Sequence, residues 1–143
     1  GNIISLDKRN GWKNWTRDLS TNQTPLVNGN SIYIISNNKE IINLDTKNGK
    51  IRWITKIDEE LSKNYLNIWY SPILVNNKLF IVGGDKKFIL LNPYDGKIEK
   101  IKNLPSLPAS APFVAKSKIY LNMRNGDIID IEWKKFNSFS WKT

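Results

Sequence analysis

The apolar residues of this chain come in short runs, and the runs are separated by connectors rich in Asn, Gly, Asp and Lys. One stretch shows a complete unit, with runs at 73–75, 79–82, 88–91 and 98–102. Connectors of two to five residues that contain Asn-Gly, Asp-Gly or Gly-Asp are strong signals for β-hairpins. The pattern therefore predicts short antiparallel strands, four to a unit.

Several of the runs lack alternation between apolar and polar residues. Ile32 to Ile35 and Phe80 to Val82 are continuous apolar stretches. Continuous runs of this kind are typical of strands whose two faces are both covered. We therefore expect each sheet to be sandwiched between neighbouring sheets.

The chain is repetitive, and two elements recur in the same phase. Residues 4–15 return as residues 42–53 and, weakened, as residues 89–100. A proline followed eight residues later by an aromatic residue occurs three times, at Pro25 and Tyr33, Pro72 and Phe80, and Pro112 and Tyr120. Such agreement between independent elements indicates a true internal repeat.

Four-stranded antiparallel units at a spacing of about 40 residues are typical of β-propeller blades. The predicted fold is all-β, with almost no helix. It is a partial β-propeller of about three and a half four-stranded antiparallel blades. We place a half-blade at 3–19, blades at 24–57 and 71–103, and a last blade at 111–143.

Within the repeat, an Asp, a Gly and a Trp have fixed spacing. The Gly is expected to adopt positive φ and close the turn, while the Asp accepts backbone N–H groups within it. The Trp, four residues after the Gly, is expected on the outer strand, covering the gap to the next blade. Asp as a general acid or a metal ligand is the alternative interpretation. The predicted structural motif comprises Asp7, Gly11, Trp15, Asp45, Gly49, Trp53 and Gly96.

The formal charge of +9 raises the question of a nucleic-acid partner. Lys outnumbers Arg by eighteen to four and is spread along the chain, which favours a generally solvated basic surface over a phosphate-binding footprint. No nucleic-acid partner is therefore predicted. The absence of Cys excludes disulfides and thiolate metal sites.

Membrane contact is expected through a partner or through a lipid anchor missing from this sequence. Residues 1–7 do not form a signal peptide, and no apolar run approaches about 18 residues.

The order Leu-Asp, three residues, Gly, and Trp four residues later resembles the tryptophan docking motif of the quinoprotein-like propellers, which are built from PQQ-like repeats. Residues 6–15 and 42–53 match it well. Residues 91–100 depart from it, with Asn92 in place of Asp and Lys100 in place of Trp. This family includes quinoprotein dehydrogenases, the propeller lipoprotein of the outer-membrane β-barrel assembly machinery, and sensor or adaptor propellers.

A catalytic quinoprotein needs a quinone, a Ca²⁺ ion held by carboxylate and amide oxygens, and an Asp base. Here there is no His or Cys, and the acids stand singly in turns apart from residues 58–60. The resemblance therefore implies a non-enzymatic scaffold similar to the barrel-assembly propeller, periplasmic and associated with the outer membrane. No catalytic residue, cofactor or metal is predicted. The alternatives are a fragment of a quinoprotein oxidoreductase and a ligand-sensing propeller.

The expected partner is a protein, such as the outer-membrane barrel-assembly complex, bound through connectors at 58–70, 83–87 and 103–110. The first connector is the longest, and exposed aromatics there would be favoured anchors. The candidate anchors are Tyr65, Ile68, Trp69 and Tyr70. The alternative is that Trp69 and Tyr70 pack beneath the connector as local core.

Three and a half blades cannot close into a ring. We therefore expect either self-association that completes the propeller or a C-terminal tail, 136–141, that folds back as a strand.

Overall fold

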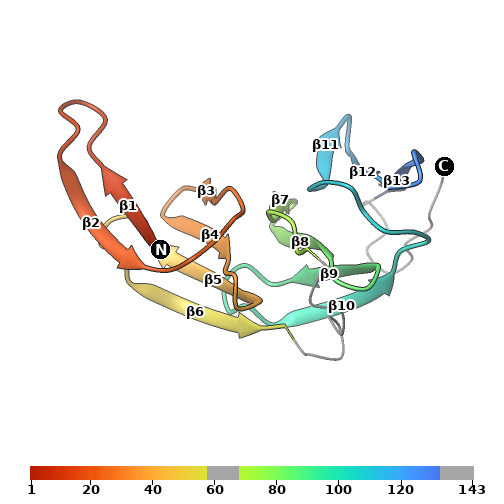
Figure 1. Ribbon diagram of the computed structural model, residues 1–143, viewed down its shortest axis with the longest axis horizontal. Coiled ribbons are helices and arrows are strands. Elements are labelled where there is room, and N and C mark those ends of the chain that lie inside the picture. Colours follow the sequence, from red (N-terminus) through yellow and green to blue (C-terminus); the bar gives the residue numbers. More distant parts are fainter. Residues whose placement is uncertain (58–67, 133–143) are drawn as a thin grey trace.

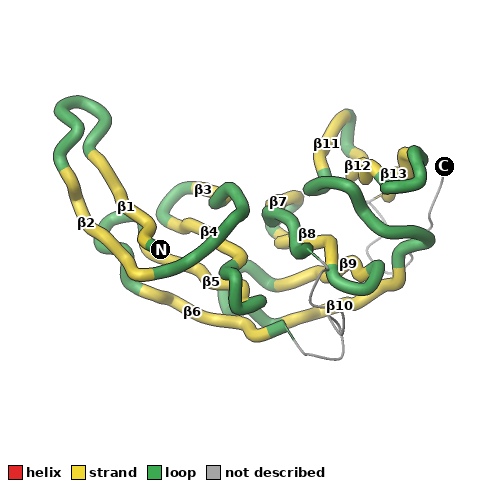
Figure 2. Tube along the Cα trace, viewed as in Figure 1, coloured by secondary structure: helices red, strands yellow, loops and turns green. Residues whose placement is uncertain are grey.

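The chain folds into successive small sheets that follow one another along an arc (Figure 1). The computed structural model describes residues 1–57 and 68–132, and within these residues there are strands and turns but no helix (Figure 2). Every strand pairing is antiparallel. The predicted all-β class and partial propeller are confirmed.

The described strands form four sheets, each with its strands in sequence order, and the first of these sheets is a two-stranded hairpin. The hairpin consists of β1 (Asn2–Leu6) and β2 (Lys13–Asp18). The second sheet consists of β3 (Leu26–Asn28), β4 (Ser31–Ile35), β5 (Glu40–Asp45) and β6 (Ile51–Lys56). The third consists of β7 (Ile73–Val75), β8 (Lys78–Gly83), β9 (Lys87–Leu91) and β10 (Ile98–Asn103). The last consists of β11 (Phe113–Ala115), β12 (Lys118–Asn122) and β13 (Ile128–Glu132).

The C-terminal segment 133–143, which includes the predicted end of the last blade and the tail 136–141, lies outside the described residues.

In the second and third sheets, which have four strands each, the two middle strands are buried on both faces, as their unbroken apolar runs predicted. Five consecutive residues of β8, from Leu79 to Gly83, are buried. The outer strands β6 and β10 instead alternate between exposed and less exposed residues. The middle strands therefore supply the core, and burying each large apolar side chain contributes about 1.5–3 kcal/mol.

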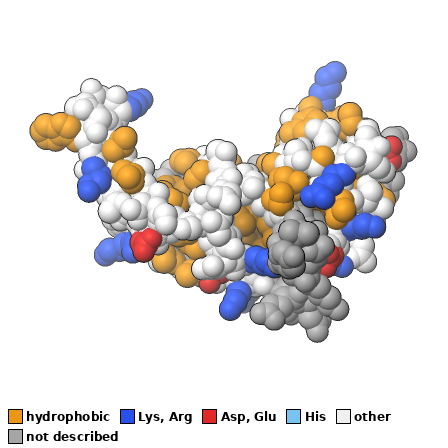
Figure 3. Space-filling view, in the orientation of Figure 1, with side chains coloured by type: hydrophobic (Ala, Val, Ile, Leu, Met, Phe, Trp, Pro, Cys, Tyr) orange, Lys and Arg blue, Asp and Glu red, His pale blue; other side chains and the backbone are white. Residues whose placement is uncertain are grey.

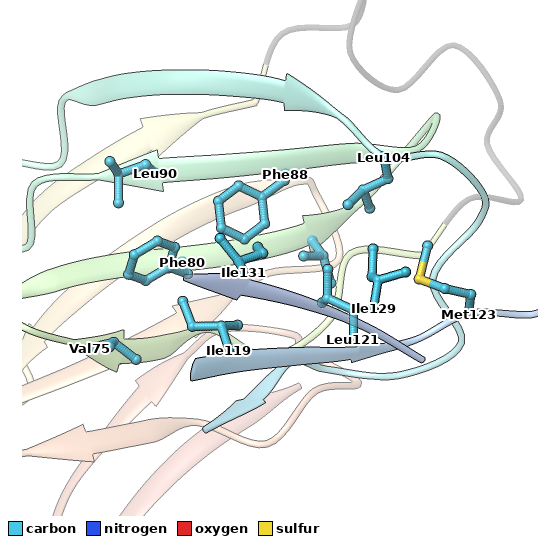
Figure 4. Close-up of a cluster of buried hydrophobic side chains, with 11 residues drawn as sticks. Val75, Phe80, Phe88, Leu90, Leu104, Ile119, Leu121, Met123, Ile129 and Ile131 are labelled. Atoms are coloured by element: carbon cyan, nitrogen blue, oxygen red, sulfur yellow. The ribbon is translucent and has the colours of Figure 1, made fainter. Parts of the chain in front are cut away.

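The core is divided into clusters that lie between neighbouring sheets. Figure 4 shows the cluster between the third and last sheets, where Phe80 and Phe88 face Ile119 and Ile131. The two phenylalanine rings lie 5.3 Å apart between centroids. Similar clusters fill the two earlier junctions. Sheet-to-sheet packing thus holds the arc together.

Candidate functional site

The turn between the third and fourth strands of a blade is built from side-chain oxygens and one glycine. In residues 45–50, Asp45 Oδ1 accepts the backbone N–H of Lys47 at 2.8 Å, and Asn48 Oδ1 accepts that of Lys50 at 2.9 Å. Gly49 has φ +68° and donates its N–H to the Asp45 carbonyl. We call residues 45–50 and their counterparts, 7–12 and 92–97, the glycine turns.

The other two glycine turns have the same bonding. Asp7 accepts the backbone N–H of Arg9, and Asn92 accepts that of Tyr94, each at 2.8 Å. Gly11 and Gly96 have φ +76° and +74°. The amide oxygen of Asn92 therefore does what the carboxylate does in the other copies.

Hydrogen bonding also lowers the pKa of two of these carboxyl groups. The side chain of Arg9, and then its backbone N–H, lower the pKa of Asp7. The backbone N–H of Lys47 is the largest cause of the lowered pKa of Asp45, with Arg52 contributing less. Both carboxylates are thus ionised and engaged by their own turns, which supports the structural interpretation of the motif.

An indole joins the hairpin to the second sheet. Trp15, on β2, is 9% exposed and lies over Gly49, where an added Cβ would lie 2.5 Å from the ring. Its Nε1 donates to the Thr46 carbonyl at 2.9 Å. Two residues later, Arg17 Nε donates to the Gly49 carbonyl at 2.8 Å. The outer strand of one blade therefore docks onto the glycine turn of the next.

The same contact joins the second sheet to the third. Trp53, on β6, lies over Gly96 and donates its Nε1 to the Pro93 carbonyl at 2.9 Å. Thr55 donates its hydroxyl to the Gly96 carbonyl at 2.5 Å. We call these two contacts the indole junctions.

The predicted anchors on the connector before β7 differ in how far their side chains are buried. Trp69 is 4% exposed and pairs with Gly83. Tyr70 is half-buried against the core and donates its backbone N–H to Val82. These two residues extend the edge of β8, so they pack within the protein instead of standing on an exposed loop. Ile68 is 45% exposed, and Tyr65 lies outside the described residues.

The connectors between sheets and the turns between second and third strands lie on one face, because successive strands alternate in direction. Backbone bonds tie them together. Ile57 N–H donates to Lys39 at 2.9 Å, Gly84 to Ile68 at 3.2 Å, and Leu104 to Lys86 at 2.7 Å. We call this surface the connector face.

The connector face is hollowed between the second and third sheets. The hollow has a volume of about 360 Å³ and is lined by Asn22, Gln23, Ile35, Ser36, Asn37, Lys39, Ile68 and Trp69. Amide and hydroxyl side chains dominate its polar part, and these both donate and accept hydrogen bonds. Of these lining residues, the sequence analysis named Ile68 and Trp69 as candidates but did not name Asn22, Gln23 or Asn37, which lie on separate polar segments with no distinguishing pattern.

A metal site in a protein needs several ligating side chains close together. Among the residues that the structure describes, no group of three His, Cys, Asp or Glu side chains could hold a metal ion. None of the described residues forms a helix long and apolar enough to span a membrane.

Residues 1–55 match the family model described as outer membrane protein assembly factor BamB. The crystal structure of BamB from Moraxella catarrhalis superposes with a TM-score of 0.76 over 97% of this chain, at 19% identity. The chain has the fold of the quinoprotein-like β-propellers. It spans 45% of the length of that BamB chain.

Redox enzymes share this fold. Quinohemoprotein alcohol dehydrogenase from Comamonas testosteroni superposes with a TM-score of 0.61 at 19% identity, covering 80% of this chain and 19% of its own. A europium-containing methanol dehydrogenase gives 0.60 at 19% identity, covering 83% of this chain and 24% of its own. No curated protein sequence matches significantly.

Proposed function

We propose that the chain is a non-enzymatic, protein-binding scaffold, periplasmic and associated with the outer membrane. Its role is that of a propeller component in the machinery that assembles outer-membrane β-barrels. The observation that carries this proposal is the match of residues 1–55 to the family model of outer membrane protein assembly factor BamB.

The chemistry of the chain supports the same role. Asp7 and Asp45 are engaged within glycine turns, so neither is poised as a general base or a metal ligand. The connector face instead offers neutral amides around an exposed aliphatic side chain, Ile68. The amides of such a surface can form hydrogen bonds with the backbone of a protein partner, while the partner covers the apolar Ile68.

Charge placed at Ile68 tests the proposal. Ile68→Glu should weaken binding to the purified outer-membrane β-barrel assembly complex by about tenfold or more, because a carboxylate would be desolvated in the contact. Tyr94→Glu is the control, because Tyr94 is 75% exposed on a glycine turn, at the opposite ends of the strands from the connector face. Equal binding by both variants and the wild type would rule out the connector face as the contact.

A fragment of a quinoprotein oxidoreductase is the second candidate, favoured by the shared fold of the alcohol and methanol dehydrogenases. Titration of the chain with pyrroloquinoline quinone and Ca²⁺ separates the two functions. The scaffold function predicts no stoichiometric quinone binding and no alcohol-dependent dye reduction. Saturable quinone binding with turnover would favour the oxidoreductase.

A further inference from the structure

The side chain of Trp69 carries a buried hydrogen-bond donor that has no acceptor. The residue is 4% exposed, and its indole Nε1–H has no hydrogen-bond partner among the described residues. The indoles of Trp15 and Trp53 instead donate to the Thr46 and Pro93 carbonyls. Buried polar groups in proteins almost always have a partner, so an unpaired donor of this kind needs an explanation.

The hollow of the connector face lies beside this donor. Trp69 lines the hollow together with the exposed Ile68. Its volume of about 360 Å³ is near the lower end of the range of about 300–1,000 Å³ that is typical of ligand sites. The hollow can therefore hold a small ligand or a short segment of a chain, but not a folded surface.

Hydrogen bonds fix both walls of the hollow. On the side of the second sheet, the Asn37 N–H donates to the Ser20 carbonyl at 2.8 Å. On the side of the third sheet, the Gly84 N–H donates to the Ile68 carbonyl at 3.2 Å. The two walls are therefore in place before a ligand binds, which is usual for binding sites and limits the entropy lost on binding.

The lining of the hollow determines which class of ligand fits it. Asn22 and Asn37 are exposed, and their side chains form no hydrogen bond with the described residues. Each amide offers both a donor and an acceptor, as a peptide group does. Trp69 adds a donor that suits a carbonyl oxygen, and Ile68 adds an apolar contact. The hollow is therefore complementary to a peptide backbone that carries an apolar side chain.

The charge of the lining disfavours a polyanionic ligand. Among the described residues that line the hollow, only Lys39 is charged. Figure 3 shows Lys and Arg side chains spread over both ends of the arc instead of gathered into one patch on that face. Phosphate-rich ligands are bound by several Lys and Arg side chains close together. A peptide segment thus fits the hollow better than a nucleotide or a nucleic acid.

We propose that the hollow binds an extended peptide segment whose backbone carbonyl accepts the indole N–H of Trp69. The amides of Asn22 and Asn37 pair with neighbouring peptide groups of the segment, which an extended chain leaves accessible. Ile68 contacts one of its apolar side chains. This inference rests on the proposed protein-binding function and deepens it, because it names the part of a partner that the connector face recognises.

Nuclear magnetic resonance of the ¹⁵N-labelled chain, titrated with a library of short peptides with blocked ends, tests the proposal. The chain has six Trp residues, and the indole signal of Trp69 is the one that Trp69→Phe removes. Peptides that bind should shift this signal. Trp69→Phe should weaken their binding by about tenfold, because it removes the donor and keeps an aromatic ring. Trp12→Phe is the matched control, because it removes an indole that is 75% exposed and should leave binding unchanged.

Asn37→Ala supplies a second variant at an exposed side chain, and it should weaken peptide binding by about threefold or more. Circular dichroism melting curves check that each variant remains folded. Acetate is titrated in parallel as a small carboxylate. A Trp69 signal that responds to acetate but to no peptide would overturn the proposal. So would a library without a binder, or peptides that bind the wild type and Trp69→Phe equally well.

The outcome is distinguishable from that of the proposed function. Binding of the assembly complex is measured separately, with Ile68→Glu. A complex that binds through Ile68, together with peptides that leave the Trp69 signal unmoved, would remove this inference alone. Peptides that bind at Trp69, together with a complex that does not bind, would remove the proposed partner and support peptide recognition by the hollow.

Discussion

Trp53 lies where the second blade meets the third, and its ring and its nitrogen serve the junction in different ways. The ring covers Gly96 and packs near Tyr33, with ring centroids 6.1 Å apart. The nitrogen donates to the Pro93 carbonyl, in the same glycine turn that receives the Thr55 hydroxyl at Gly96. One side chain thus combines apolar burial with a directional bond across the junction.

Truncating this side chain should therefore destabilise the arc. Trp53→Ala is expected to lower the free energy of unfolding by about 3–5 kcal/mol, as large aromatic truncations in cores do. Trp12→Ala, at an indole that is 75% exposed, should change it by less than about 0.5 kcal/mol. Urea denaturation of both variants gives the comparison. A Trp53→Ala cost below about 1 kcal/mol would mean that the indole junction does not hold the blades together.

The glycine beneath the indole can be tested separately from its backbone conformation. Gly49→Ala and Gly29→Ala both place a side chain at positive φ, which costs about 1–2 kcal/mol. A Cβ at Gly49 would also overlap the Trp15 ring, which should add about 1–3 kcal/mol, whereas a Cβ at Gly29 meets open space. Thermal or urea unfolding should rank Gly49→Ala as the more damaging. Equal costs would show that Trp15 does not dock on this glycine in solution.

At the scale of the element, the glycine turn was the most predictable feature of the chain. Its Asp and Gly have fixed spacing, and local hydrogen bonds within a few residues determine its shape. The glycine turn at 92–97 shows that the spacing matters more than the charge. Its Asn92 accepts the backbone N–H two residues later, as Asp45 does in the turn at 45–50. In the third sheet, the four predicted strands agree with β7 to β10 to within one residue at each end, since strand limits follow directly from the turns.

The glycine turn predicts a response to acid. The pKa of Asp45 is lowered in the folded state, chiefly by the backbone N–H of Lys47. Its ionised form therefore stabilises the fold above the ordinary Asp pKa of 3.8, and this stability is lost as the pH falls through the lower folded value. Asp45→Asn keeps the acceptor without the charge. It should lose less thermal stability than the wild type between about pH 4 and pH 2. Parallel slopes for the two proteins in melting experiments would contradict this.

The connector before β7 could not be predicted in the same way. Its sequence shows Ile68, Trp69 and Tyr70 together, but it does not show that the chain returns along the edge of β8. That return depends on Gly83, whose missing side chain leaves room for the backbone at Ile68 and Trp69. Contacts between residues so far apart depend on the path of the intervening connector, which no local pattern encodes. The hollow that contains Asn22 and Asn37 was missed for the same reason.

At the scale of the molecule, the arc has two surfaces of different construction at the two ends of its strands. The glycine turns and indole junctions lie at one end of the strands and join blade to blade. The connectors lie at the other end and leave a polar hollow beside Ile68. The junction residues and the proposed partner-binding residues are therefore on opposite faces, and the proposed binding at the connectors would leave the junctions undisturbed.

Site-specific photo-cross-linking in the bacterial envelope tests the proposed protein-binding role most directly. A photoreactive phenylalanine analogue replaces Ile68 on the connector face in one variant and Tyr94 on the opposite face in another, both at exposed positions. The scaffold function predicts cross-links from position 68 to a component of the outer-membrane β-barrel assembly complex, with few from position 94. Cross-links to that complex from position 94 alone, or from neither position, would contradict it.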